Sequence, residues 1–373
     1  MELTFEKDEL LRAVQVLQGV AGSRNTLPIL SNILVNAQAR TEQGERHEQI
    51  EMSATDLEVG IRIKVNGTIV EPGSITIPAR KIAEIIRELP PSVVKIITTA
   101  NNRVEIECER GVYTMIGLAS DDFPPMMSMP DEFFTINTET FKTMIAKTAF
   151  AASTEETRYY LNGVFLHLTP EESRIVATDG RRLAMAKSSA AGAVTEEIGV
   201  IVPIKAVGEI RRTFAGSENL KISISENQII FSDDASTLTS RLVEGEFPDY
   251  ERIIPKDNDI NIYLDTQQLL SVVRRVSLLA NPKTLLIKFE TQDGILKVSA
   301  TNPDFGEAHE EMEIKSGDGN IVIAFSAKFA IDVLTHIDSE EVLLNLKDPL
   351  SATLLKPADD ENYLYLIMPM RLD

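Results

Sequence analysis

Two aspartates, Asp56 and Asp179, are the acidic residues whose placement could serve a reaction. Each ends an Ala-Thr-Asp tripeptide, the two copies lie 123 residues apart, and a third copy, after the same interval, ends in Asn302. Such carboxylates could hold a metal ion for hydrolysis. Asp and Asn at equivalent places can also close a turn through their side chains. Because catalysis does not need three copies, we favour the turn and keep a metal-dependent hydrolase as the alternative.

Other signals for catalysis are absent from the sequence. It contains no G-x-x-x-x-G-K-[ST] or G-x-G-x-x-G phosphate loop and no G-x-S-x-G nucleophile motif. The four histidines lack the spacing of metal ligands, and the one cysteine, Cys108, lies in an alternating segment that predicts a core position. We therefore predict no catalytic residue, no metal site and no cofactor.

The tripeptide is part of a longer repeat that divides the chain into three. Phe123-Pro124 recurs as Phe247-Pro248 in nearly the same register. An interval above about 100 residues indicates whole tandem domains and not solenoid repeats. We predict domains at residues 1–130, 131–256 and 257–373, each large enough to bury its own core.

Each predicted domain combines two helices with many strands. In the first domain, apolar residues recur at helical spacing in 10–21 and in 82–89. Segment 61–65 alternates apolar and polar residues before Asn66-Gly67, which is typical of a β-hairpin. Hairpins imply antiparallel sheets, so the predicted fold class is α+β.

Composition limits the function classes. A formal net charge of −20 argues against a protein that coats nucleic acid by bulk attraction. No apolar run reaches the roughly 20 residues of a membrane helix, and the first residues lack a signal-peptide pattern, so we expect a cytoplasmic protein without membrane contact. The cations nevertheless gather on the polar faces of the predicted helices. Those faces are either ordinary solvated surfaces or a surface for a polyanion.

Several segments carry a family resemblance over the whole length. The most specific are Arg158-Tyr159-Tyr160-Leu161-Asn162-Gly163 and the closing Met368-Pro369-Met370-Arg371-Leu372. With them the chain resembles the bacterial DNA polymerase sliding clamp, the beta processivity subunit. The resemblance implies three DNA-clamp domains with sheets outside and helices inside. It also implies a head-to-tail homodimer that closes into a ring around double-stranded DNA, independent of base sequence and without enzymatic activity.

The resemblance also implies DNA contacts. It places Arg24, Tyr159 and Tyr160 where the family touches DNA, and the helix cations would join them. The alternatives are an exposed loop cation for Arg24 and a packed corner for the two tyrosines. The predicted DNA-binding residues are Arg24, Arg80, Lys147, Tyr159, Tyr160, Lys205, Arg212 and Arg275.

A groove for partner peptides is the second implied site. Leucine and methionine provide an adaptable apolar surface, and threonine, glycine and arginine can contact an extended peptide. Without the resemblance, 368–372 would be the last core strand and a tail. Arg181, where some relatives carry histidine, and Asp373, beyond the usual final leucine, are departures from the family. The groove residues are Leu161, Thr178, Gly180, Arg182, Leu183, Pro248, Arg252, Ile253, Leu350, Met368, Pro369, Met370, Arg371 and Leu372.

The dimer contact follows from the same resemblance. An apolar centre with a charged rim is typical of protein interfaces. The predicted interface residues are Lys81, Arg103, Leu278, Leu279, Glu307, Glu310 and Glu311. The implied partners are the replicative polymerase, an ATP-driven clamp loader, and other replication and repair proteins that carry short clamp-binding peptides. A self-associating acidic scaffold that does not touch DNA is the alternative.

Overall fold

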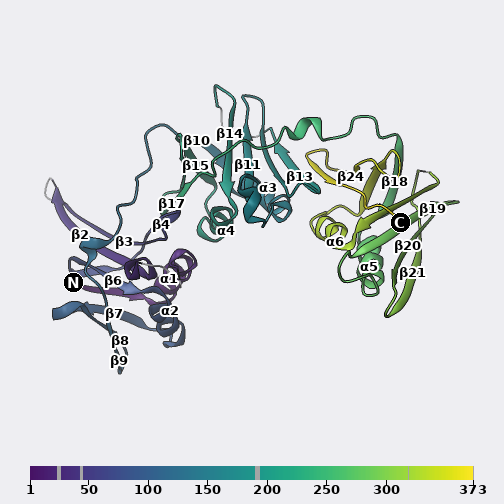
Figure 1. The fold of residues 1–373 in the computed structure, drawn as a ribbon. Helices are drawn as coiled ribbons and strands as arrows, with labels where there is room; N and C mark the ends of the chain where they lie inside the picture. The colour runs from purple at the N-terminus through teal and green to yellow at the C-terminus, as the bar shows by residue number, and fades with distance from the viewer. Residues whose placement is uncertain (23–26, 43–44, 190–193, 318, 373) are drawn as a thin grey trace. The chain divides into compact units, whose positions relative to one another are not determined.

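By its internal contacts the chain divides into two compact units, whose helices and strands are labelled in Figure 1. The computed structural model describes residues 1–22, 27–42, 45–189, 194–317 and 319–372. Unit 1 comprises Met1–Thr138 and Lys205–Leu242, and unit 2 comprises Glu139–Ile204 and Val243–Asp373. Each unit combines residues of two predicted domains, because two of the sheets continue across the predicted boundaries. The three-domain division therefore stays a prediction at this stage.

Unit 1 contains two antiparallel sheets. Their strand orders are β5-β1-β7-β8-β9 and β10-β15-β16-β17-β4-β3-β2-β6. The helices are α1 (Lys7–Val20), α2 (Ala79–Glu88) and α4 (Ile204–Thr213). The strands are β1 (Glu2–Glu6), β2 (Asn32–Glu42), β3 (Glu45–Thr55), β4 (Val59–Lys64), β5 (Thr68–Glu71), β6 (Gly73–Pro78), β7 (Val93–Thr98), β8 (Arg103–Cys108), β9 (Gly111–Ile116), β10 (Phe134–Asn137), β15 (Asn219–Ile224), β16 (Gln228–Ser232) and β17 (Ser236–Arg241).

Unit 2 repeats this plan with sheets β14-β11-β12-β13-β25-β24-β23-β18 and β21-β20-β19-β22. Its helices are α3 (Thr138–Ala146), α5 (Thr266–Ser277) and α6 (Ala327–Thr335). Its strands are β11 (Gly163–Leu168), β12 (Ser173–Thr178), β13 (Arg182–Ser188), β14 (Ile198–Pro203), β18 (Ile260–Asp265), β19 (Leu286–Gln292), β20 (Ile295–Asn302), β21 (Gly306–Glu313), β22 (Ile321–Ser326), β23 (Glu341–Leu346), β24 (Thr353–Pro357) and β25 (Tyr363–Ile367). The predicted α+β class with antiparallel sheets is confirmed.

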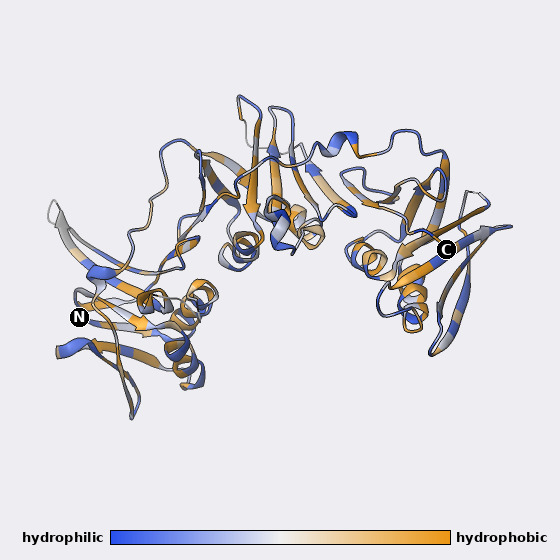
Figure 2. Ribbon diagram, viewed as in Figure 1, coloured by the Kyte–Doolittle hydropathy of each residue, from blue (hydrophilic) through white to orange (hydrophobic). Residues whose placement is uncertain are grey.

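Apolar stripes decide which face of each helix is buried. Helix α1 buries Leu10, Val14 and Leu17, and it packs beside α2, which buries Ile82 and Ile86. Helices α5 and α6 form the corresponding pair in unit 2. Figure 2 shows hydrophobic residues along the helices and central strands, with hydrophilic residues toward loops and strand ends. In the part of the chain that is described, no helix is long and apolar enough to cross a membrane.

The repeated tripeptide forms the same kind of turn three times. The Asp56 carboxylate accepts the N–H of Val59 at 2.8 Å, and the Asp179 carboxylate accepts the N–H of Arg182 at 3.1 Å. The Asn302 side chain accepts the N–H of Asp304 at 2.9 Å. The predicted turn role is confirmed. Among the described residues, no group of His, Cys, Asp and Glu is arranged to hold a metal.

Two of these turns lead into strands that join neighbouring repeats. After the first turn, β4 pairs with β17, the last strand of the second repeat. After the second turn, β13 pairs with β25, the last strand of the third repeat. The equivalent strands that remain are β9, the last of the first repeat, and β21, which follows the third turn. Both are end strands of their sheets.

Candidate functional site

The groove residues all lie in unit 2, and most belong to four segments around the β13–β25 junction. Arg182, at the start of β13, faces Ile367 at the end of β25, and Ile367 also faces Thr353 of β24. The N–H of Met368 donates to the carbonyl of Arg181 at 2.9 Å. The antiparallel register therefore brings the segment after β25 alongside the β12–β13 turn and the loop before β24. The short helix η6 (Tyr250–Arg252) supplies the fourth segment.

A buried apolar cluster underlies this junction. It contains Leu183, Tyr250 and Leu366, together with Val176, Leu354 and Leu364. Around it, apolar side chains remain open to solvent. The exposed members are Ile253 (44%), Leu350 (68%), Met368 (42%) and Leu372 (44%). Exposed apolar residues beside a packed base can cover an apolar ligand without refolding.

Two cavities, each lined by a different set of segments, include groove residues in their walls. A cavity of about 240 Å³ is lined by Phe150, Arg181, Arg182 and Phe329. A second cavity, of about 630 Å³, is lined by residues around η6, including Arg252 and Ile254. Arg252 and residues of the β12–β13 turn thus border open space.

Arg182 is a buried structural cation and not a free contact. Its guanidinium donates to the Asp179 carboxylate at 3.1 Å, the Asp332 carboxylate at 2.6 Å and the Phe150 carbonyl at 2.7 Å. Burial opposes its charge, but Tyr365 and Asp332 raise the pKa of Arg182 above its ordinary value. Charge-paired and only 6% exposed, Arg182 ties β13 to α6 and to the loop after α3.

Thr178 and Gly180 shape the turn beside Arg182. The Thr178 hydroxyl donates to the Arg182 carbonyl at 2.5 Å and accepts the Gly180 N–H at 3.0 Å. Gly180 has a φ of +85°, and a Cβ there would lie 2.6 Å from Nη1 of Arg158. The left-handed backbone therefore favours glycine, and a methyl group there would require the end of the Arg158 side chain to move.

The other groove residues divide by exposure. Arg252 is exposed and paired with Asp249 at 2.7 Å, and Arg371 is exposed. The Met370 N–H donates to the Ala324 carbonyl at 2.7 Å. Leu161 is buried at the end of η5 (Glu156–Leu161), whereas Pro248, Pro369 and Met370 are half-buried. Asp373 lies outside the described residues. Exposed and half-buried members could meet a ligand, and buried ones support them.

Sequence reasoning missed two residues of this site. Arg158 lies over Gly180, and Tyr250 anchors η6 in the apolar cluster. Arg158 opens the segment that carries the family resemblance, and Tyr250 lies two residues after the repeated Phe247-Pro248. Their positions in these motifs were the available signal.

Most of the predicted DNA-binding cations are paired on the surface. Arg80 is bonded to Glu84 at 2.9 Å, and Arg212 to Glu209 at 2.8 Å. The Lys205 ammonium pairs with Asp56, the turn residue of the first repeat. Bonds from Lys81 and Arg80 lower the pKa of Glu84. The side chains of Arg80, Lys205 and Arg212 are themselves 79%, 44% and 64% exposed, so these cations remain available to a polyanion.

The remaining predicted DNA contacts differ among themselves. The Lys147 side chain is only 17% exposed, lies 3.5 Å from Asp360 and stands over the Tyr363 ring. Tyr159 is exposed and meets half-buried Tyr160 edge to face, with ring centroids 6.0 Å apart. Arg24 lies outside the described residues. Lys147 is therefore less accessible than the other described cations among these predictions.

The predicted interface residues occupy both units. In unit 1, Lys81 pairs with Glu84 at 2.7 Å and Arg103 is exposed at the start of β8. In unit 2, Leu278 is 81% exposed and Leu279 is half-buried. Glu307 and Glu311 are exposed on β21, and Glu310 accepts two bonds from the predicted DNA contact Arg275, at 2.8 and 2.6 Å. These bonds lower the pKa of Glu310.

Comparisons with known proteins agree with this arrangement. Family models of the DNA polymerase III beta subunit match the N-terminal domain at residues 1–128, the central domain at 135–249 and the C-terminal domain at 251–371. The beta sliding clamps of Pseudomonas aeruginosa and Caulobacter vibrioides are 35% and 36% identical, with 100% of each chain covered.

Solved structures show the same similarity. The DNA polymerase III subunit beta of Pseudomonas aeruginosa has a TM-score of 0.92 at 34% identity, and the sliding clamp of Bartonella birtlesii bound to griselimycin has 0.92 at 32%, each covering both chains fully. The chain therefore belongs to the DNA polymerase III beta subunit family, the bacterial sliding clamps. Proteins of this family are processivity factors of DNA replication and not enzymes, so the hydrolase alternative is wrong.

Proposed function

We propose that two copies of this chain close head to tail into a ring that encircles duplex DNA, slides along it, and tethers the polymerase through the unit 2 groove. The observation that carries the proposal is the pair of end strands β9 and β21. They are the equivalents of strands that are paired at both internal junctions. Each chain leaves β9 at the edge of one sheet and β21 at the edge of another. In a dimer, β9 of each copy can therefore pair with β21 of the other copy.

The junctions also predict which residues meet. In unit 1, the N–H of Arg241 donates to the carbonyl of Glu58. Arg241 corresponds to Ile116, since each ends its hairpin opposite the first residue of the preceding strand. By strand pairing Glu58 corresponds to Phe305, because Gly60 faces Thr55 and Glu307 faces the equivalent Thr301, and Glu58 and Phe305 each lie two residues before these partners. Ile116 is 69% exposed and Phe305 is 75% exposed.

The register of unit 2 is shifted by one residue, which would set Ile116 opposite Gly306 and beside Phe305. Either register covers two large apolar side chains, together with exposed Leu278. Acidic residues of β21 and the cation Arg103 would supply a charged rim.

Retention by closure explains the charge distribution. The chain carries a formal net charge of −20, so attraction alone does not favour DNA. Cations on the helices, such as Arg80, Lys205 and Arg212, would meet phosphates weakly and without reading bases. Weak contacts permit sliding, and the topological link prevents escape. Loading then requires a separate ATP-driven loader in the cytoplasm, because the sequence has no phosphate loop.

The groove would tether the polymerase and other partners through short peptides. Its exposed leucine, isoleucine and methionine side chains suit several related apolar sequences. Griselimycin, which is bound to relatives from Pseudomonas aeruginosa and Bartonella birtlesii, is a ready probe of this surface. We expect it to bind the groove here. Substitutions on η6 and after β25 should weaken binding and leave the dimer unchanged.

Topological retention has a direct test. The protein is loaded by a clamp loader onto nicked circular DNA, and the circle is then cut once. We expect release after cutting and retention on the uncut circle, because only a closed circle blocks the sliding ring. Retention on linear DNA with free ends would overturn the proposal.

Ring closure through β9 and β21 is tested by cross-linking. Facing residues of antiparallel strands have Cα atoms about 4.5–5.5 Å apart, which suits a disulfide. Ile116→Cys with Phe305→Cys, or with Gly306→Cys, should give a covalent dimer on oxidation. Val112→Cys with Phe305→Cys is the mismatched control. The buried Cys108 should stay unreacted. Equal cross-linking by matched and mismatched pairs would contradict the register.

A further inference from the structure

Tyr250 joins one wall of the groove, formed by η6 and Ile253, to the sheet beneath it. It is 4% exposed, and its ring packs in the apolar cluster with Leu183 and Leu366. It is also the first residue of η6, which continues into the groove residues Arg252 and Ile253. Any force that fixes Tyr250 therefore fixes the position of this wall.

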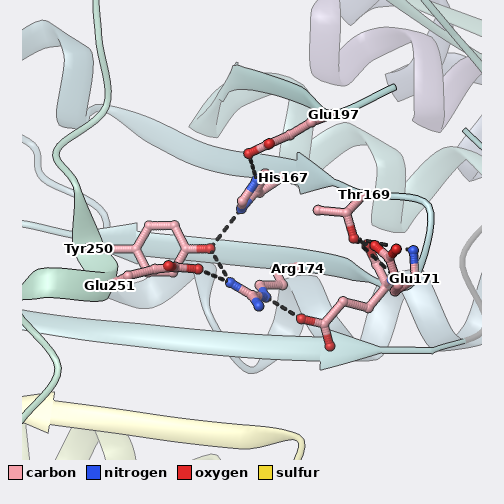
Figure 3. Close-up of polar contacts among 8 residues, drawn as sticks. His167, Thr169, Glu171, Arg174, Glu197, Tyr250 and Glu251 are labelled. Carbon is pink, nitrogen blue, oxygen red and sulfur yellow. Dashed lines mark hydrogen bonds and ion pairs between the residues drawn. The ribbon is translucent and has the colours of Figure 1, made fainter. Parts of the chain in front are cut away.

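Two polar side chains, Arg174 and His167, hold Tyr250 and the residue after it (Figure 3). Arg174 Nη1 donates to the Tyr250 hydroxyl at 2.9 Å and to the Glu251 carboxylate. His167 Nδ1 lies 2.7 Å from the Tyr250 hydroxyl, and its Nε2 lies 2.7 Å from Glu197. His167 and Arg174 face each other on β11 and β12. Strands β11 and β12 thus hold two consecutive residues of η6 by side-chain hydrogen bonds.

The hydrogen bonds run in one consistent direction. Burial raises the pKa of Tyr250, so its phenol keeps its proton. The hydroxyl accepts from Arg174 and can donate to Nδ1 of His167 in the tautomer that carries its proton on Nε2, which then donates to Glu197. Bonds to Tyr250, Glu251 and Glu172 raise the pKa of Arg174 despite its burial. Each group then has a partner, which makes the attachment rigid.

Unit 1 builds the same junction without this attachment. Its residue equivalent to Tyr250 is Met126, by the Phe-Pro register. Met126 fills the space above Gly60, whose added Cβ would lie 2.8 Å from the Met126 methyl carbon. The equivalent of Gly60 is Leu183. A flexible methionine without a hydroxyl is therefore enough to complete a junction, so the tether of Tyr250 is not needed for strand pairing.

We propose that Tyr250, Arg174 and His167 are positioning residues of the peptide groove: they fix η6 so that Arg252 and Ile253 meet the peptide, and they act without contacting it. The inference rests on the proposed function of the groove. It adds Tyr250, Arg174 and His167 to the residues that determine peptide affinity, although they lie behind η6 and do not touch the peptide.

The test compares subtle variants by binding and by local opening. Tyr250→Phe removes only the hydroxyl and keeps the ring, and Arg174→Lys keeps the charge but loses the fork. We expect each to weaken binding of fluorescently labelled griselimycin to the full-length dimer by about threefold to tenfold. Tyr263→Phe, on β18 of the same unit, is the matched control and should bind as the unchanged protein does.

A conservative rescue separates positioning from bulk packing. His167→Asn keeps an acceptor for the Tyr250 hydroxyl and should retain affinity, whereas His167→Leu should lose as much as Tyr250→Phe. Amide hydrogen exchange should quicken at 250–254 in the weakened variants and stay unchanged in β11 to β13. A lower urea midpoint with faster exchange throughout unit 2 would instead indicate a general fold role and overturn the inference.

The remaining outcomes distinguish the two proposals. If the unchanged protein binds griselimycin and Tyr250→Phe binds equally well with unchanged exchange at 250–254, the positioning inference is wrong and the groove stands. If the unchanged protein does not bind griselimycin, the groove proposal fails. The positioning inference rests on that proposal and fails with it.

Discussion

The β17–β4 junction of unit 1 and the β25–β13 junction of unit 2 share one backbone plan and differ in a few side chains. The residue that begins the second strand is Val59 in unit 1 and Arg182 in unit 2. The turn before it contains Leu57 at φ +78° in unit 1 and Gly180 at φ +85° in unit 2. The same repeated scaffold thus forms an apolar junction once and an arginine-centred junction once.

The helices beside these junctions differ in the same way. Helix α4 carries buried Glu209, and α6 carries Asp332 at the equivalent position. Asp332 accepts a bond from Arg182 across the junction, whereas Glu209 accepts from Arg212 on its own helix. After the last strand, unit 2 continues with apolar 368–372. The two junctions therefore differ by four features on a repeated frame: unit 2 has a mostly apolar tail, a small turn residue, a buried cation and the attachment of Tyr250 to the sheet.

Removing the buried cation should have the largest effect. Arg182→Met leaves Asp179 and Asp332 without their partner, which costs about 3–5 kcal/mol for a buried pair. Val59→Ala at the equivalent position should cost about 1–2 kcal/mol through lost packing. Urea unfolding measures both. Adding Asp332→Leu to Arg182→Met should recover part of the lost free energy of unfolding. If nothing is recovered, the destabilisation by Arg182→Met comes from lost packing and not from the unpaired carboxylate.

Truncating the apolar tail should abolish peptide binding with little change in stability. Each apolar side chain that a ligand covers contributes about 1.5–3 kcal/mol, so Met370→Ala with Leu372→Ala should weaken griselimycin binding more than 100-fold. Sedimentation should still report a dimer. Leu57→Ala with Met127→Ala in unit 1 is the matched control. Unchanged affinity in the tail variant would place the binding surface elsewhere.

Exchanging the turn residues should have opposite effects in the two units. Leu57→Gly removes a leucine from a left-handed backbone conformation and should raise the free energy of unfolding by about 1 kcal/mol. Gly180→Ala should lower it by a similar amount and displace Arg158, whose Nη1 lies where the methyl group would stand. Thermal unfolding measures the direction of each change in stability. If both variants shift stability in the same direction, the expected difference between the two turns is contradicted.

The smallest expected effect concerns pH and unit 1. Burial raises the pKa of Glu209 above its ordinary 4.5, and within the described chain its Oε2 has no hydrogen-bond partner. The folded protein therefore holds this proton more tightly than the unfolded chain. Its stability should fall as pH rises from 4.5 through the raised pKa. Glu209→Gln should flatten that fall in urea titrations, whereas Glu88→Gln, on an exposed part of α2, should leave it unchanged.

The sequence predicted the local features of this fold well. The repeated tripeptide identified turns, because a side-chain oxygen two or three residues before a backbone N–H is a local arrangement. Helical spacing in 10–21 and 82–89 identified α1 and α2, whose cores follow from the same periodicity. These features need no knowledge of which strands pair.

Long-range placement was outside the reach of that reasoning. Arg182 looked like a ligand contact, but partners up to 183 positions away in the chain, at Tyr365, enclose it. Lys147 looked like an open helix cation, but Tyr363 and Asp360 cover it. Pairing of β17 with β4 joins segments from different repeats, and no local pattern specifies such a partner.

The unlike character of β9 and β21 has a consequence for direction. When a ring closes through two different edges, rotation about its axis relates the copies, and both present the same side upward. Each ring would then have a front and a back, and its two grooves would share one orientation relative to them. Every partner that uses these grooves would approach the double helix from the same end, so the order in which enzymes follow one another on DNA would become a matter of exchange at a single face.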